Sequence, residues 1–308
     1  MVLKEAEKPV PNDNQVLVKI MAASVNPLDW HFLRGDPYFI RFMTGFPRPK
    51  QQILGVDMAG IIEAVGKNVK EFKLGDEVFG AGGLGAFAEY VCKNEDKIIH
   101  KPAHLNFAQA AAIPVAGLTA LQGFRKGKIQ AGQKVLIIGA AGGVGSFAVQ
   151  IAKSYGAQVT GVCSTKSIEL VRSLGADNVI DYTKKDYTKS GQLYDLILDN
   201  ASPYSISSFR QILTKNGVYV GVGGGGTVMQ MIMSLILAMI YSVTSKKKFK
   251  TLLTNINKVD LKTVRELIES GKVKIVIDRT YPFEKIPDAI RYLEEGHARG
   301  KVVIEVAS

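Results

Sequence analysis

The chain has 308 residues, of which 46% are hydrophobic and 22% charged, which is typical of a soluble globular protein long enough for two domains. Its two cysteines, Cys92 and Cys163, stand far apart in the sequence and suggest neither a disulfide framework nor a cysteine-rich zinc site, so we expect a reducing, cytoplasmic location. The net charge of +11 is compatible with a polyanionic partner, but the basic residues are mostly scattered and no nucleic-acid-binding motif accompanies them, so we expect no nucleic acid partner.

Before residue 113, the chain predicts short β-strands separated by glycines and prolines. We expect these strands at Gln15 to Ala22, Ile53 to Val65, Glu77 to Phe79 and Phe87 to Cys92. This part is therefore predicted to be a β-rich domain.

After residue 113, strands and helices alternate. Strands are expected at Lys134 to Gly139, Gln158 to Cys163, Asn178 to Asp181, Tyr194 to Asp199 and Gly217 to Val222, with helices at Gly143 to Tyr155, Lys166 to Leu174 and Ser205 to Leu213. Such a series indicates a parallel sheet with right-handed crossovers.

The most apolar stretch, residues 228–243, is about four residues short of the roughly 20 that a membrane-spanning helix needs. We expect a buried helix whose four methionines line a pocket or a dimer interface. Peripheral membrane contact through this helix and the lysine run at 246–250 stays open as an alternative, as does a solvated turn for that run.

The tail changes pattern again after a last sheet strand at Phe249 to Leu253. It predicts helices at Leu261 to Ser270 and Ile286 to Glu295 and strands at Lys274 to Thr280 and Lys301 to Glu305. We place this tail with the N-terminal β-rich part. The expected organisation is therefore a parallel-sheet domain at 113–256, inserted in a domain formed by 1–112 and 257–308.

A glycine-rich turn joins the first strand and helix of the parallel series. Its residues run from Gly139 to Gly145, and Ala140 stands where the G-x-G-x-x-G fingerprint has its first glycine. Between a buried strand and an amphipathic helix, such a turn brings the backbone close to a pyrophosphate at the helix N-terminus. The sequence therefore predicts a dinucleotide site held by Gly142, Gly143, Val144 and Gly145.

The residues after the second strand decide between the two nicotinamide cofactors. An acidic residue there accepts hydrogen bonds from a free ribose hydroxyl, but the segment after Cys163 has none. Ser164, Thr165 and Lys166 form a candidate cradle for a 2′-phosphate, which favours NADPH. The alternative is that a hydroxyl caps the next helix and the lysine is solvated.

Metal ligands are not indicated. The four histidines, His31, His100, His104 and His297, do not pair with a cysteine at ligand spacing. We predict no metal.

Motifs along nearly the whole chain resemble the medium-chain dehydrogenase/reductase superfamily, in its zinc-free quinone oxidoreductase branch. They are ASVNPLD at 23–29, GVDMAG at 55–60, GDEV at 75–78, AAAIP at 110–114, GLTA at 117–120, AAGGVG at 140–145, GAD at 175–177 and GKVV at 300–303. The resemblance implies an α/β fold, a Rossmann domain inserted in a GroES-like β-rich substrate domain. Zinc-dependent members carry a cysteine in the segment matched by 24–29 and a histidine in that matched by 55–60, and this chain has neither. Members also begin with a further β-strand, so we expect one edge of the substrate domain to lack a strand.

The resemblance also implies roles for single residues. Asn26 is similar to the active-site asparagine near the nicotinamide and the substrate carbonyl, the alternative being a loop-capping amide. Further cofactor contacts are implied for Thr119, Tyr182, Gly221, Val222 and Gly223, and more weakly for Arg299 and Lys301. Apart from the resemblance, Tyr38, in the segment at 36–39, is a candidate proton donor, the alternative being an ordinary loop aromatic.

We therefore expect an NADPH-dependent reductase that transfers a hydride to quinones or α,β-unsaturated carbonyls without zinc, and a homodimer. The alternative is an NADPH-binding structural or interaction protein with little turnover.

Overall fold

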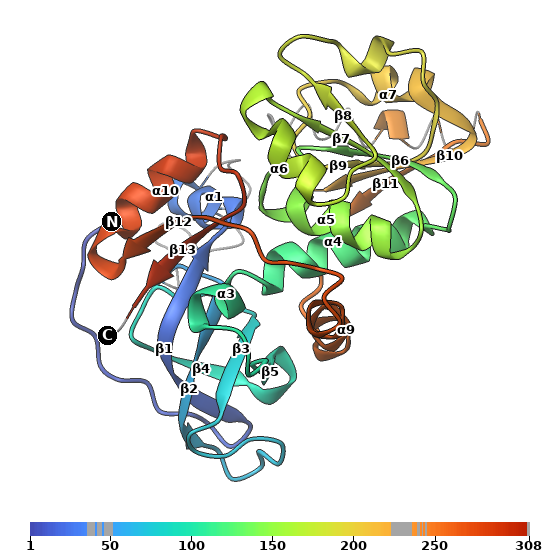
Figure 1. Ribbon diagram of the computed structural model, residues 1–308. Coiled ribbons are helices and arrows are strands. Elements are labelled where there is room, and N and C mark those ends of the chain that lie inside the picture. Colours follow the sequence, from blue (N-terminus) through green and yellow to red (C-terminus); the bar gives the residue numbers. More distant parts are fainter. Residues whose placement is uncertain are drawn as a thin grey trace. The chain divides into compact units, whose positions relative to one another are not determined.

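The computed structural model describes residues 1–35, 41, 45, 52–222, 236–238, 241, 243 and 245–306. The chain forms two compact units, and Figure 1 colours it along the sequence. Unit 1 comprises Met1–Leu118, Asn255–Glu269 and Ile275–Ser308, and unit 2 comprises Thr119–Thr254 and Ser270–Lys274. The domain boundaries expected after residues 112 and 256 stay predictions.

Unit 1 is built on a seven-stranded sheet in the order β12-β13-β1-β2-β3-β5, with β4 also paired to β1. Its strands are β1 (Gln15–Val25), β2 (Asp57–Val65), β3 (Glu77–Ala81), β4 (Tyr90–Asn94), β5 (Ile98–His100), β12 (Ile277–Pro282) and β13 (Lys301–Glu305). Strand β13 runs antiparallel to β1, with Val302 opposite Val25. The tail thus returns to the first sheet, which confirms the expected inserted architecture.

The α-helices that lie wholly in unit 1 and have described bounds are α1 (Pro27–Arg34), α3 (Phe107–Ala111), α9 (Lys258–Glu269) and α10 (Ile286–Glu294). Helix α1 begins at a proline, whose fixed φ suits a first helical position, and ends at Gly35 with φ of 59°. Helix α10 buries Ile286, Ala289 and Ile290 on one face against the core of the unit.

Unit 2 has a six-stranded sheet in the order β11-β10-β9-β6-β7-β8, and all its strand pairs are parallel. The strands are β6 (Lys134–Ile138), β7 (Gln158–Cys163), β8 (Asn178–Asp181), β9 (Tyr194–Asp199), β10 (Leu213–Val222) and β11 (Lys248–Leu252). Helices of this unit with described bounds include α5 (Gly143–Ser154), α6 (Ile168–Ser173) and α7 (Ile206–Ile212), together with most of α4 (Pro114–Gly127). In Figure 1, α5 lies below this sheet and α7 above it, as the expected parallel-sheet domain requires.

One strand of the tail was predicted too early in the chain. It was expected at Lys274 to Thr280, but β12 spans Ile277–Pro282. Lys274 is held elsewhere, because its N–H donates to Gln150 Oε1 at 2.7 Å and its carbonyl accepts from Gln150 Nε2 at 2.9 Å.

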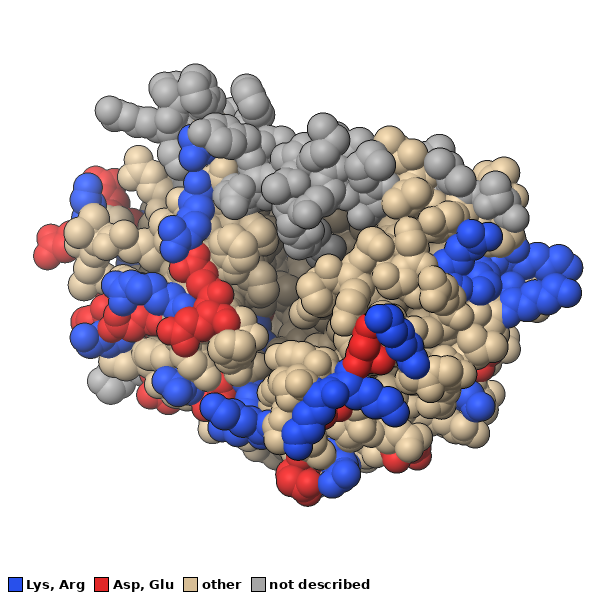
Figure 2. All heavy atoms as spheres, turned by 90° about the horizontal axis from the view of Figure 1, so that it is seen from above, with Lys and Arg blue, Asp and Glu red and all other residues tan. Residues whose placement is uncertain are grey.

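The apolar helix expected at 228–243 lies mostly outside the described residues, of which 236–238, 241 and 243 are helical. Among the helices that are described, none combines the length and the apolar character needed to cross a bilayer. Figure 2 shows lysine and arginine side chains at many places on one face, often beside Asp or Glu.

Candidate functional site

A buried carboxylate on β2 joins four segments of unit 1. Asp57 Oδ2 accepts hydrogen bonds from Ser24 Oγ at 2.9 Å and Asn26 Nδ2 at 3.0 Å, and Oδ1 accepts from the Val115 N–H at 3.0 Å. The Lys301 ammonium lies 3.4 Å from the same Oδ2. Each partner satisfies part of a charge that would otherwise be costly to bury.

Lys301 is the cation of this cluster. Its ammonium donates to Asn26 Oδ1 at 2.6 Å and to the Val25 carbonyl at 3.2 Å. Burial lowers the pKa of the Lys301 ammonium, and the charges of Asp57 and Asp29 oppose that shift. These contacts engage the ammonium within unit 1, and the cofactor contact that the resemblance implies for Lys301 stays a prediction.

The Asn26 amide is oriented by these two neighbours. An ammonium can only donate and an ionised carboxylate can only accept, so Oδ1 faces Lys301 and Nδ2 faces Asp57. The second hydrogen of Nδ2 points to the Ser24 carbonyl at 3.4 Å. The side chain expected to act near the substrate is thus 3% exposed and held on both sides.

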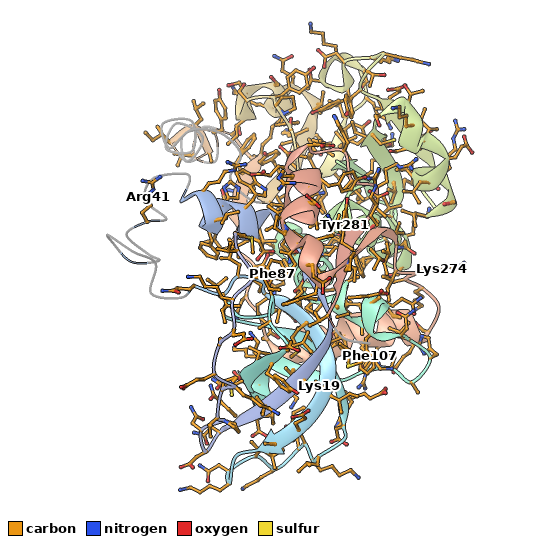
Figure 3. All side chains as sticks on the ribbon, turned by 90° about the vertical axis from the view of Figure 1, so that its left-hand side faces the viewer. Lys19, Arg41, Phe87, Phe107, Lys274 and Tyr281 are labelled. Atoms are coloured by element: carbon orange, nitrogen blue, oxygen red, sulfur yellow. The ribbon has the colours of Figure 1, made fainter. Side chains whose placement is uncertain are left out.

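Asp29 ties the loop that carries Asn26 to the segment before β2. Its carboxylate accepts from the Asn26 N–H at 2.8 Å and from the Gly55 N–H at 3.2 Å. Burial raises the pKa of Asp29 to about 7, and the Asp57 charge adds to the shift, while the two hydrogen bonds oppose it. Gly55 has φ of +88°, and a Cβ there would lie 2.6 Å from the ring of Phe87, which Figure 3 labels.

The glycine-rich turn of unit 2 follows β6 and opens α5. Gly139 adopts φ of +70°, and its carbonyl accepts from the Gly142 N–H at 3.1 Å. A Cβ at Gly145 would lie 2.0 Å from the Gly139 carbonyl oxygen, so only glycine fits there. The Ser146 N–H donates to the Gly142 carbonyl at 2.9 Å, and the N–H groups of Gly143, Val144 and Gly145 precede this bond at the helix N-terminus, where an anion is favoured.

Ala140 replaces a fingerprint glycine without disturbing the turn. It is buried, and its N–H donates to the Val162 carbonyl at 3.0 Å. The facing residue on β7 is Gly161, where an added Cβ would lie 3.1 Å from Ala140 Cβ. The methyl group of Ala140 is accommodated because the neighbouring strand has a glycine, Gly161, beside it.

Asn200 supports the fit of a dinucleotide at this edge of the sheet. The strand order reverses between β6 and β9, and in such sheets ligands bind at the carboxyl ends of the strands on either side. Asn200 follows β9 and donates through Nδ2 to the Ile138 carbonyl at 2.9 Å. Its Oδ1, although buried, has no hydrogen-bond partner within the described chain, which costs on the order of 1–3 kcal/mol. A hydroxyl or amide of a bound cofactor would supply the donor, so the residues present fit the group.

The ends of β7 and β8 bring together the predicted 2′-phosphate residues. Cys163 is opposite Asp181 in the sheet, and its carbonyl accepts from the Tyr182 N–H at 3.1 Å. Ser164 is half-buried, and Thr165, Lys166 and Tyr182 are exposed. All four predicted residues therefore belong to adjoining strand ends.

Sequence reasoning missed a carboxylate at this place. Thr165 Oγ1 donates to Asp181 Oδ2 at 2.5 Å, and hydrogen bonds from Thr165 and Thr183 lower the pKa of Asp181. The sequence could have indicated this carboxylate, because Asp181 is the last residue of β8, which pairs with β7, and β7 ends at Cys163.

The other predicted residues lie as follows. Thr119, on α4, is buried, and its hydroxyl lies 2.8 Å from that of Thr254. Gly221 and Val222 end β10 and are half-buried, and Arg299 is exposed before β13. Tyr38 and Gly223 fall outside the described residues. In the part of the chain that the structure describes, no three His, Cys, Asp or Glu side chains gather as a metal site would require, and zinc independence stays a prediction.

Two parts of the chain match known protein families. Residues 12–103 match the alcohol dehydrogenase GroES-like domain, and residues 174–304 match the zinc-binding dehydrogenase family.

Individual relatives match over almost the whole chain. A chloroplastic quinone oxidoreductase of Triphysaria versicolor is 37% identical, over 98% of this chain and 94% of its own length. A chloroplastic NADPH-dependent alkenal/one oxidoreductase of Arabidopsis thaliana is also 37% identical, over 96% of this chain and 73% of its own. The solved quinone oxidoreductase of Coxiella burnetii is 31% identical and superposes with a TM-score of 0.86, over 98% of this chain and 93% of its own.

Proposed function

This chain belongs to the medium-chain dehydrogenase/reductase superfamily and is an oxidoreductase that uses a nicotinamide cofactor, and on that premise we propose that it reduces quinones or α,β-unsaturated carbonyls with NADPH. The observation that carries the proposal is the hydrogen-bonded cluster of Ser24, Asn26, Asp57 and Lys301. Ser24, Asn26 and Asp57 lie in the two segments that resemble those holding the metal ligands of zinc-dependent members, and Lys301 joins them from β13. A network of donors there suits a reaction in which negative charge develops on a substrate oxygen. The names of the two plant relatives support the same substrates.

When bound, the reduced nicotinamide supplies the hydride. The residues of the chain bind the cofactor and orient the substrate. The first turn of α5 holds the pyrophosphate, and Asn26 Nδ2 is the donor for the substrate oxygen. Asn26 Nδ2 can exchange its hydrogen bond to Asp57 for one to the substrate. Asp57 Oδ2 then still has Ser24 and Lys301 as partners, so it is not left unpaired.

The preference for NADPH rests on Ser164, Thr165 and Lys166, with Tyr182 beside them. The Ser164 hydroxyl and the Lys166 ammonium donate to a 2′-phosphate. The Thr165 hydroxyl gives its hydrogen to Asp181, whose charge works against the phosphate. The printed name of the Arabidopsis relative, NADPH-dependent, supports the same choice.

A homodimer is part of the proposal. Strand β11 ends the sheet order of unit 2, and an edge strand offers unpaired backbone groups to a second copy. Light scattering decides this, since a particle of 33.4 kDa would be a single chain.

The proposed activity is tested by following NADPH oxidation at 340 nm with simple quinones, alkenals, enones, ketols and saturated ketones. We expect turnover with quinones or enones and little with saturated ketones. Turnover confined to ketols or saturated ketones, or none with the whole panel, would refute the proposal.

A further inference from the structure

Unit 2 has a cavity at the edge of the sheet opposite the glycine-rich turn. Its volume is about 380 Å³. The turn follows the carboxyl end of β6, whereas this cavity is bounded by the end of α4 and the first residues of β9, β10 and β11. The residues around it are Gly127, Lys128, Gln130, Gln133, Asp195, Thr214, Asn216, Val218, Lys248 and Lys250.

The charged side chains around the cavity are three lysines and one carboxylate, Asp195, so positive charge is in excess. Lys128, Lys248 and Lys250 form no salt bridge within the described chain. Both oxygens of Asp195 are engaged, one by the Lys134 N–H at 3.0 Å and the other by Thr214 Oγ1 at 3.1 Å. Burial lowers the pKa of Lys250, and so do the charges of Lys128, Lys126 and Lys248, as expected where cations crowd together.

Within the described residues, Lys250 is the one of these three lysines whose side chain bonds to the fold. Lys250 donates to the Lys126 carbonyl at 2.7 Å and so caps the C-terminal end of α4. Lys128 has φ of +58°, a backbone conformation that favours glycine, and it is the only non-glycine residue of the described chain with a positive φ. Neither Lys128 nor Lys248 contributes a side-chain bond to the fold within the described residues.

The uncharged groups around the cavity also favour an anion. Gln133 Oε1 already accepts from the Gln130 N–H at 2.9 Å, so the group that Gln133 has left to offer is its NH₂ donor. Asn216 adds a further amide. Ammonium and amide donors around a hollow of this size suit phosphate oxygens.

We propose that this cavity is a second ligand site of the protein, separate from the cofactor edge, which binds a small phosphorylated molecule through Lys128, Lys248 and Lys250. The site goes beyond the reductase function, and its ligand is set by charge and size: at least two negative charges within reach of three ammonium groups.

Calorimetric titration tests the site with inorganic pyrophosphate as the probe. The full chain is first saturated with NADPH, so that the phosphate-binding groups at the glycine-rich turn are occupied. We expect saturable binding that weakens with added sodium chloride. Losing one charge-assisted bond reduces affinity on the order of tenfold, so Lys128→Gln with Lys248→Gln should weaken binding by about a hundredfold.

Lys246→Gln is the matched control, because Lys246 belongs to the same basic run but does not border the cavity. It should bind pyrophosphate as the wild type does, and all variants should keep their affinity for NADPH. The site is refuted if the NADPH-loaded wild type binds no pyrophosphate, or if the double variant binds it equally well. Lysine-dependent flotation with acidic lipid vesicles in the absence of pyrophosphate binding would likewise overturn a small-molecule ligand.

Discussion

The ammonium of Lys301 donates a 2.6 Å hydrogen bond to Oδ1 of Asn26, although the two residues are 275 positions apart in the chain. Both side chains are at most 3% exposed. The contact leaves Nδ2 of Asn26 as the donor side of the amide, next to Asp57. Lys301 is therefore a positioning residue for the group that we propose meets the substrate oxygen.

Replacing Lys301 by methionine should disorient Asn26 and leave Asp57 without its cation. We expect kcat with an enone to fall at least tenfold and NADPH affinity to stay within about twofold. Breaking a buried pair costs about 3–5 kcal/mol, so stability should fall as well.

The double variant Lys301→Met with Asp57→Asn separates the two effects. Removing both charges should recover part of the stability lost in Lys301→Met, as denaturant titration would measure, while kcat stays low. Wild-type kcat in either variant would show that Lys301 does not position a catalytic group.

Asp29 should make stability depend on pH. Its pKa in the folded chain is raised to about 7 from the ordinary 3.8, so the folded state binds the proton more tightly than the unfolded state. Between these values, stability falls as pH rises, by about 1.4 kcal/mol per pH unit from this group. Above pH 7 its contribution no longer changes.

Asp29→Asn cannot titrate and should lose this slope, whatever its absolute stability. Free energies of unfolding from urea titrations at pH 4.5, 5.5 and 6.5 give the comparison. Equal slopes in the variant and the wild type would refute the assignment.

The sequence predicts the parts of this structure that depend on neighbours along the chain. The strands β6, β7 and β9 are short apolar runs, and the turn from Gly139 to Gly145 combines a strand, glycines and a helix in one segment. Lys301 could not be linked with Asn26 in this way, because only the pairing of β13 with β1 brings them together.

Helix α4 was missed for a different reason. Its glycines disfavour a helix by local propensity. In the structure, however, Gly123 and Gly127 let the helix pack closely on β9, where added Cβ atoms would lie 2.7 Å from Leu198 and 2.5 Å from Leu196. Tertiary packing thus outweighs propensity here.

Substitutions at the residues predicted to hold the 2′-phosphate should change NADPH affinity by a predictable amount and in a predictable direction. A charge-assisted hydrogen bond is worth roughly 1.5–3 kcal/mol, so Lys166→Ala should weaken NADPH binding on the order of 10- to 100-fold and barely change NADH binding. Ser164→Asp should reverse the preference by placing a carboxylate beside the phosphate. Fluorescence titration with both cofactors measures the ratio. An unchanged ratio in Ser164→Asp would remove Ser164 from the site.

Asp181 should act in the opposite direction. Asp181→Asn removes a negative charge beside Thr165 and keeps an oxygen that accepts its hydroxyl. We expect NADPH to bind more tightly, by up to about fivefold at low salt, with NADH unchanged. Glu169→Gln, on the exposed face of α6, is the matched control. Weaker NADPH binding in Asp181→Asn would mean that this carboxylate helps to hold the cofactor.

The central claim is hydride transfer from NADPH to the carbon–carbon double bond of an enone, and isotope labelling tests it most directly. The protein is given a cyclic enone and NADPH that carries one deuterium on nicotinamide C4, in two separate preparations with the deuterium on opposite faces of the ring. We predict that one isomer yields the saturated ketone with one deuterium on the β-carbon. An allylic alcohol with deuterium on the carbonyl carbon, or a product without label from both isomers, would contradict the account.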